Sequence, residues 1–104
     1  MVKIDTEFRK GVLFVRLIGQ IDNGDYLESI NYLIDNIGIK YIVLNIGNLR
    51  WVDVNSINQI IKYNKKILKK KGRLLICDTN HNRKTIFKDI IPKINCEIDA
   101  FSLI

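Results

Sequence analysis

The chain has 104 residues, of which 47% are hydrophobic and 27% charged, and its formal net charge is +6. This length suits one domain with its own core, so we expect residues 1–104 to fold as a single unit. The apolar content excludes an intrinsically disordered chain. A transmembrane helix is excluded because the sequence contains no run of about 18 apolar residues without charges. The first five residues alternate apolar with charged, unlike a signal peptide, so we expect a cytoplasmic protein.

The basic character of the chain has two explanations. An isoelectric point near 9.4 suits a nucleic-acid or anionic membrane partner. The sequence is also rich in Ile, Asn and Lys and has a single Ala, a skew typical of an AT-rich genome. Mutational bias therefore explains the excess of lysine at least as well.

The cysteines indicate neither a disulfide nor a metal site. Cys77 and Cys96 have no CxxC spacing, and His81, the single histidine, cannot complete a four-ligand zinc site with them. Both cysteines lie in apolar runs. We expect both to be reduced and buried.

The first elements along the chain form a predicted β-hairpin. Residues 2–8 alternate apolar and polar positions, as a half-buried strand does. A tight turn over residues 9–11 leads into an almost continuously apolar run, residues 12–18. Such a run is typical of a strand covered on both faces.

A helix and a strand are expected next. Asp25 opens the helix with Glu28 in capping-box spacing, and Gly38 is placed to end it in a left-handed conformation. Residues 39–46 form a β-rich run that Gly47 bounds. The helix has an apolar stripe of Tyr26, Leu27, Ile30, Leu33, Ile34 and Ile37.

The second helix follows a predicted loop over residues 47–52. Asp53 is a good N-cap for it, Gly72 stops it, and residues 73–77 form the fourth strand. The predicted buried stripe consists of Ile57, Ile60, Ile61, Asn64 and Leu68, and the opposite face of Lys62, Lys65, Lys66 and Lys69. We interpret the lysine face as solvated, since nucleic-acid binding would favour aromatic residues among the lysines.

The last elements are a short helix over residues 80–90 and a strand over residues 94–98. Ile86, Phe87 and Ile90 would face inward, and Pro92 ends the helix. The complete order is β-β-α-β-α-β-α-β. Strands alternating with helices predict an α/β fold with a mostly parallel, mixed five-stranded sheet.

Two segments resemble the STAS domain, the fold of bacterial anti-sigma factor antagonists. Residues 17–22, Leu-Ile-Gly-Gln-Ile-Asp, match the family's G-E-[LI]-D turn after the second strand. The run at residues 42–46 and its approach to Asp53 match the passage that enters the family's second helix. The element order agrees as well, so the resemblance spans nearly the whole chain. The family's final helix is shortened or missing here.

The resemblance departs from the family at its regulatory centre. The family has D-S-[ST]-G-[LI] where this chain has Asp53-Val54-Asn55-Ser56-Ile57. Asn55 therefore occupies the position of the phosphorylated Ser or Thr, and an amide cannot accept a phosphoryl group. Ser56 is a displaced candidate acceptor, although one position along a helix turns a side chain by about 100°.

The resemblance implies a regulatory module that binds a serine-kinase-type anti-sigma factor and so releases a sigma factor. The implied contact surface combines Asp22 and Asn23 with residues 53–57, namely Asp53, Val54, Asn55, Ser56 and Ile57. Asp53 could equally be a helix cap alone, and Asp22 and Asn23 turn residues. Trp51 suits either the core or the rim of a partner site.

Other functions remain as alternatives. STAS domains also serve as subunits of lipid-transport ABC systems and as stressosome scaffolds, and a basic nucleic-acid-binding domain ranks last. The sequence has no Gly-rich phosphate loop, nucleophile elbow or paired carboxylates, which indicates a protein that is not an enzyme. It indicates no cofactor, no metal and no membrane insertion.

Overall fold

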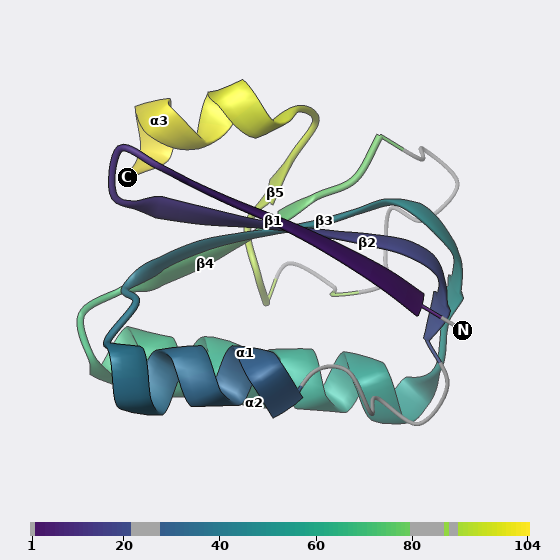
Figure 1. Ribbon diagram of the computed structural model, residues 1–104, viewed down its shortest axis with the longest axis horizontal. Helices are drawn as coiled ribbons and strands as arrows, with labels where there is room; N and C mark the ends of the chain where they lie inside the picture. Colours follow the sequence, from purple (N-terminus) through teal and green to yellow (C-terminus); the bar gives the residue numbers. More distant parts are fainter. Residues whose placement is uncertain (1, 22–27, 80–86, 88–89) are drawn as a thin grey trace.

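The computed structural model of the chain describes residues 2–21, 28–79, 87 and 90–104 (Figure 1). A single five-stranded sheet has the order β1-β2-β3-β4-β5, in which β1 is antiparallel to β2 and the other neighbours are parallel. This arrangement confirms the predicted fold class. The strands are β1 (Val2–Arg9), β2 (Val12–Ile21), β3 (Tyr41–Val52), β4 (Arg73–Cys77) and β5 (Lys93–Ile94).

The helical elements cover both faces of this sheet. The first consists of α1 (Glu28–Tyr32) and a π-helical continuation, η2 (Leu33–Ile37). As predicted, Gly38 ends it with a φ of 77°. The long helix α2 follows at Val54–Lys69, and a 3-10 turn, η4 (Glu97–Asp99), precedes a short final helix, α3 (Ala100–Leu103). Figure 1 shows α1 and α2 on one face of the sheet and α3 on the other.

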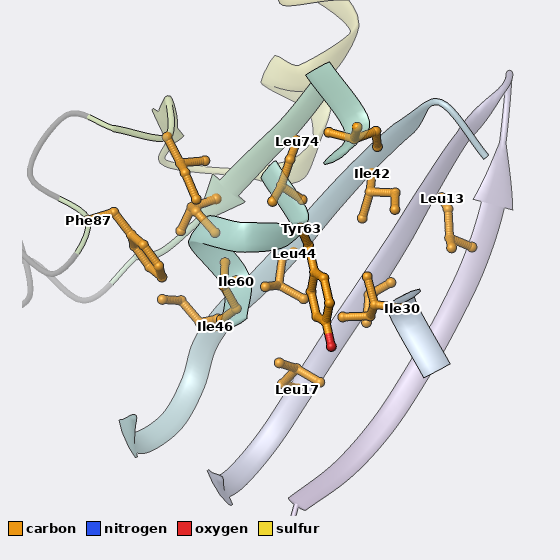
Figure 2. Close-up of a cluster of buried hydrophobic side chains, with 14 of the residues drawn as sticks. Leu13, Leu17, Ile30, Ile42, Leu44, Ile46, Ile60, Tyr63, Leu74 and Phe87 are labelled. Atoms are coloured by element: carbon orange, nitrogen blue, oxygen red, sulfur yellow. The ribbon is translucent and has the colours of Figure 1, made fainter. Parts of the chain in front are cut away.

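The core is divided by the sheet into two clusters, as expected for a second strand that is buried on both sides. Leu13, Val15 and Leu17 of β2 face α1 and α2, where they join the larger cluster (Figure 2). Val12 and Phe14 face the other way and pack with α3 through Ala100 and Phe101. The ring centroids of Phe14 and Phe101 lie 5.7 Å apart.

The third strand is longer than predicted. The sequence pattern predicts a strand that ends at Gly47 and a loop over residues 47–52, but β3 continues to Val52. Its register against β2 shifts between Arg16 and Ile18 and again between Gly19 and Gln20. Gly47 therefore lies at an irregularity inside β3 and does not end the strand. Glycine also avoids crowding at this position, because Thr79 Oγ1 would lie 3.1 Å from an added Cβ.

The C-terminal predictions need correction. The last strand stops at Ile94 instead of the predicted Ile98, so Cys96 lies on the surface, contrary to the prediction that it is buried. Cys77 is buried as expected, both thiols are free, and burial raises the pKa of Cys77 to about 11.

The helix expected over residues 80–90 lies almost entirely outside the described residues, including Ile86. Of its predicted inward residues, Phe87 is buried, whereas Ile90 is 50% exposed and does not face inward.

The buried stripe of α2 is displaced from its predicted position. Its buried members are Ser56, Ile60, Tyr63, Asn64 and Ile67. Ile57 and Ile61 are half-buried against the core, but Leu68 is 52% exposed, contrary to prediction. On the opposite face Lys62, Lys65 and Lys69 are exposed. Lys66 is half-buried because its Nζ bonds Asp35 Oδ2 at 2.7 Å and also contacts Asn31 Oδ1.

Candidate functional site

The ends of β2 and β3 bring the two sequence motifs together. Gly19 pairs with Leu49, Gln20 with Trp51, and Ile21 with Val52 in parallel register. Because β3 extends to Val52, it leads directly into Asp53 and the first turn of α2. The carboxyl ends of two adjacent parallel strands therefore meet at one edge, the position where α/β folds build binding surfaces.

Asp53 is the N-cap of α2, as predicted. Its backbone is extended, with φ −78° and ψ 165°, and its Oδ1 accepts a hydrogen bond from the Ser56 backbone N–H at 3.1 Å. Its carbonyl accepts the first helical bond, from the Ile57 N–H at 3.0 Å. Such a cap stabilises a helix by about 1 kcal/mol. It also fixes the direction in which the next side chains project.

The first turn of α2 places two side chains in solvent and the next two toward the core. Val54 is 71% exposed and Asn55 is exposed, whereas Ser56 is 0% exposed and Ile57 is half-buried. A helix turns about 100° per residue, so neighbours at 55 and 56 must point in different directions. The acceptor position of the family thus carries an exposed amide here, and the neighbouring hydroxyl is turned inward.

Ser56 begins the buried stripe of α2. The positions four, seven and eleven residues further on, Ile60, Tyr63 and Ile67, are buried against the sheet. The Ser56 hydroxyl oxygen finds no hydrogen-bond partner among the described residues. Ser56 therefore fills the place of a small packed residue.

Several predicted site residues cannot be placed. Asp22 and Asn23 lie outside the described residues, one and two positions after the end of β2. Trp51 belongs to β3 and pairs with Gln20, but its side chain is outside the described part of the chain, as is His81.

Asp78, which is not among the predicted site residues, lies at the carboxyl end of β4. It is 1% exposed, and its backbone N–H donates to the carbonyl of Ile94 at 3.1 Å. A charged residue directly after an apolar strand is a signal that could have identified it, because buried carboxylates are rare in the absence of a specific role.

An ionic cluster on the α3 side of the sheet was also missed. The Arg16 guanidinium donates to both oxygens of Glu97, at 2.9 Å and 2.8 Å, and Asn45 Nδ2 donates to Glu97 at 2.9 Å. Arg16 further pairs with Asp5 at 3.1 Å and with Glu7 at 2.8 Å. The hydrogen bonds that Glu97 accepts from Arg16 and Asn45 hold its pKa below the usual value. Arg16 was detectable as the single charged residue within the apolar run at 12–18.

The described residues supply neither a metal site nor a membrane span. Within them, no three His, Cys, Asp or Glu side chains cluster in a way that could hold a metal ion. None of their helices is long and apolar enough to cross a bilayer.

Comparison with known proteins is consistent with this geometry. The family model for the STAS domain matches residues 3–93. The anti-sigma F factor antagonist of Paenibacillus polymyxa is 32% identical over 110 aligned positions, which cover 97% of this chain and 93% of the relative.

Solved structures have the same fold. The anti-sigma factor antagonist SpoIIAA in its unphosphorylated form superposes with a TM-score of 0.78 at 12% identity, covering 98% of this chain and 94% of that one. An anti-sigma factor antagonist from Mycobacterium paratuberculosis gives 0.78 at 16% identity, covering 99% and 93%. The family match and the 32% identical relative establish that the chain belongs to the STAS-domain family of anti-sigma factor antagonists, which are non-enzymatic regulators.

Proposed function

We propose that this protein binds a serine-kinase-type anti-sigma factor in the cytoplasm and thereby releases a sigma factor. The proposed contact surface is the rim formed by the first turn of α2 and the end of β2. Its members are Asp22, Asn23, Asp53, Val54, Asn55, Ser56 and Ile57. The exposed Val54 and Asn55 would touch the partner directly, whereas Asp53 and Ser56 would hold the turn in place.

We further propose that phosphorylation does not control this binding. The observation that supports it is the pair of neighbours at the acceptor position, an exposed Asn55 beside a Ser56 that is 0% exposed. An amide nitrogen is not a competent acceptor for the γ-phosphoryl group of ATP. The buried Ser56 hydroxyl could be reached by a kinase only after the start of α2 had opened.

The first experiment tests the binding surface. We expect the full chain to bind the anti-sigma kinase of its own cell in a calorimetric titration, and Val54→Arg to weaken that binding at least tenfold. The matched control is Leu68→Arg, which changes another exposed aliphatic residue of α2 at its opposite end. Equal affinity of both variants and the unchanged protein would contradict the proposed rim.

The second experiment tests the absence of the switch. Incubation with the same kinase and ATP should add no phosphate, as measured by intact mass, and should leave the affinity unchanged. A phosphate that maps to Ser56 would establish the displaced acceptor and refute constitutive binding. Asn55→Ser, measured in parallel, should gain one phosphate if the turn still has the geometry that the kinase recognises.

A further inference from the structure

The end of the molecule opposite the rim gathers exposed basic side chains from several elements. In Figure 1 the β1–β2 turn, the starts of β3 and β4, the last turn of α2 and the end of α3 all lie at the left, whereas α2 begins at the right. We call this surface the basic end; its exposed cationic residues are Arg9, Lys10, Lys40, Lys69, Lys70, Lys71 and Arg73.

Backbone contacts make the basic end one continuous surface. Arg9 pairs with Val12, Val12 with Tyr41, and Tyr41 with Arg73 across β1 to β4. The Arg73 backbone N–H donates to the Lys40 carbonyl at 2.7 Å. The end of α2 joins the same surface, since Gly72, directly after Lys71, lies so close to the Lys40 backbone that an added Cβ would be 2.2 Å from the Lys40 carbonyl oxygen.

Acidic residues neutralise little of this charge. Asp35 lies 2.7 Å from Lys66 and 3.6 Å from Lys70, and Glu7 lies 3.5 Å from Arg9. Among the described residues, Lys40, Lys69 and Lys71 form no ion pair. The basic end therefore keeps a positive potential that would attract a polyanionic surface.

Exposed aliphatic side chains lie among these cations. Ile98 is 70% exposed and, with Arg9, Lys10 and Phe101, lines a pocket in which Lys10 Nζ lies 5.7 Å from the Phe101 ring centroid. The Leu103 carbonyl accepts a hydrogen bond from Arg73 at 2.9 Å. The exposed apolar residues at this end are Phe8, Ile37, Leu68, Ile98 and Leu103.

We propose that the basic end binds the surface of an anionic lipid bilayer. Cations interleaved with exposed Ile, Leu and Phe side chains match an interface that offers anionic headgroups above a hydrocarbon layer. A nucleic acid would attract the cations but offers no hydrocarbon layer for the exposed aliphatic side chains of Ile98 and Leu68. The rim lies at the other end, so a membrane-bound molecule would keep it available.

Vesicle sedimentation with the full chain tests this proposal. We expect binding to vesicles of phosphatidylcholine with phosphatidylglycerol, weakening with salt, and none to phosphatidylcholine alone. Each cation near an anionic surface raises the vesicle affinity about fivefold. The triple variant Lys10→Gln, Lys40→Gln, Lys71→Gln should therefore bind the anionic vesicles roughly a hundredfold more weakly. The control triple Lys3→Gln, Lys62→Gln, Lys93→Gln removes the same charge from exposed positions elsewhere and should change binding only a few fold.

A second pair of variants tests the apolar contribution. Ile98→Ser with Leu68→Ser should lower vesicle affinity by roughly tenfold, whereas Val54→Ser at the rim should leave it unchanged. No binding to the anionic vesicles, or equal losses in both lysine triples, would overturn the proposal. A nucleic-acid site would be indicated by two results together, and these would also overturn the proposal. The protein would bind a DNA duplex and lose that binding in the Lys10, Lys40 and Lys71 triple variant, and Ile98→Ser with Leu68→Ser would leave vesicle affinity unchanged. These measurements do not involve the anti-sigma partner, so their failure is independent of the proposed function.

Discussion

The two faces of the sheet are covered by different physical means. On the face toward α1 and α2, a large apolar cluster is shared between the strands and both helices (Figure 2). On the face toward α3, a smaller apolar cluster around Phe14 and Leu75 adjoins the ionic cluster of Arg16 and Glu97. The first face should supply most of the stability independently of pH, whereas the second ties the C-terminal segment to the sheet partly through charge.

The largest effect is expected from the helix-covered face. Ile67 of α2 is fully buried there, so Ile67→Ala should lower the free energy of unfolding by about 2–5 kcal/mol, the usual cost of a cavity in a packed core. Urea denaturation measures the change. The neighbouring exposed Leu68 is the control, and Leu68→Ala should cost no more than about 0.5 kcal/mol. Similar losses in the two variants would refute the assigned division of α2 into buried and exposed faces.

On the other face, Arg16→Met should cost about 1–3 kcal/mol at neutral pH, because it leaves the half-buried Glu97 without its bidentate partner. The same denaturation measurement applies. Arg73→Met is the matched control, since the exposed Arg73 side chain donates to the Leu103 carbonyl at 2.9 Å, a surface pair of a kind worth about 1 kcal/mol. If both variants lose the same amount, the ionic cluster contributes no more than a surface pair.

The cluster also makes a pH-dependent contribution. Hydrogen bonds from Arg16 and then Asn45 lower the pKa of Glu97 in the folded protein below its ordinary value of 4.5. The unfolded chain therefore binds the proton more readily, so the stabilisation is present above about pH 4.5 and is lost as the pH falls through the folded pKa. The stability difference between the unchanged protein and Glu97→Gln should shrink when urea midpoints are measured on acidification. A constant difference would mean that Glu97 does not titrate as a paired carboxylate.

The difference between the faces also explains what the sequence could predict. Apolar periodicity located the strands and α2, because burial on the helix-covered face leaves a repeating pattern. Apolar periodicity wrongly included Leu68 in the buried stripe of α2. It left out the buried residues Ser56 and Tyr63, because neither is aliphatic. Pairing across the sheet leaves no such pattern, so the contacts of Arg16 with Glu97, 81 positions apart, were invisible.

Residues typical of helix caps and turns predicted the structure correctly at some positions and wrongly at others. Asp53 and Gly38 were identified correctly because capping depends on residues close in sequence. Gly47 was misinterpreted as a strand end because an irregular strand and a turn favour the same residue, and the neighbouring strand decides between them. The exposure of Asn55 and burial of Ser56 likewise required the orientation of α2 to be known.

The smallest effect concerns the serine hydroxyl in the buried stripe of α2. Ser56→Ala removes an oxygen that is buried without a partner among the described residues, and alanine also favours the helix. We therefore expect the free energy of unfolding to change by less than about 1 kcal/mol, in the stabilising direction, in contrast to a loss of about 1 kcal/mol for Asp53→Ala, which removes the cap. A clear loss of stability in Ser56→Ala would instead assign the hydroxyl a partner and make this face less apolar than its contacts indicate. Affinity for the anti-sigma partner should not change in Ser56→Ala, since the hydroxyl faces the core while Val54 and Asn55 face solvent.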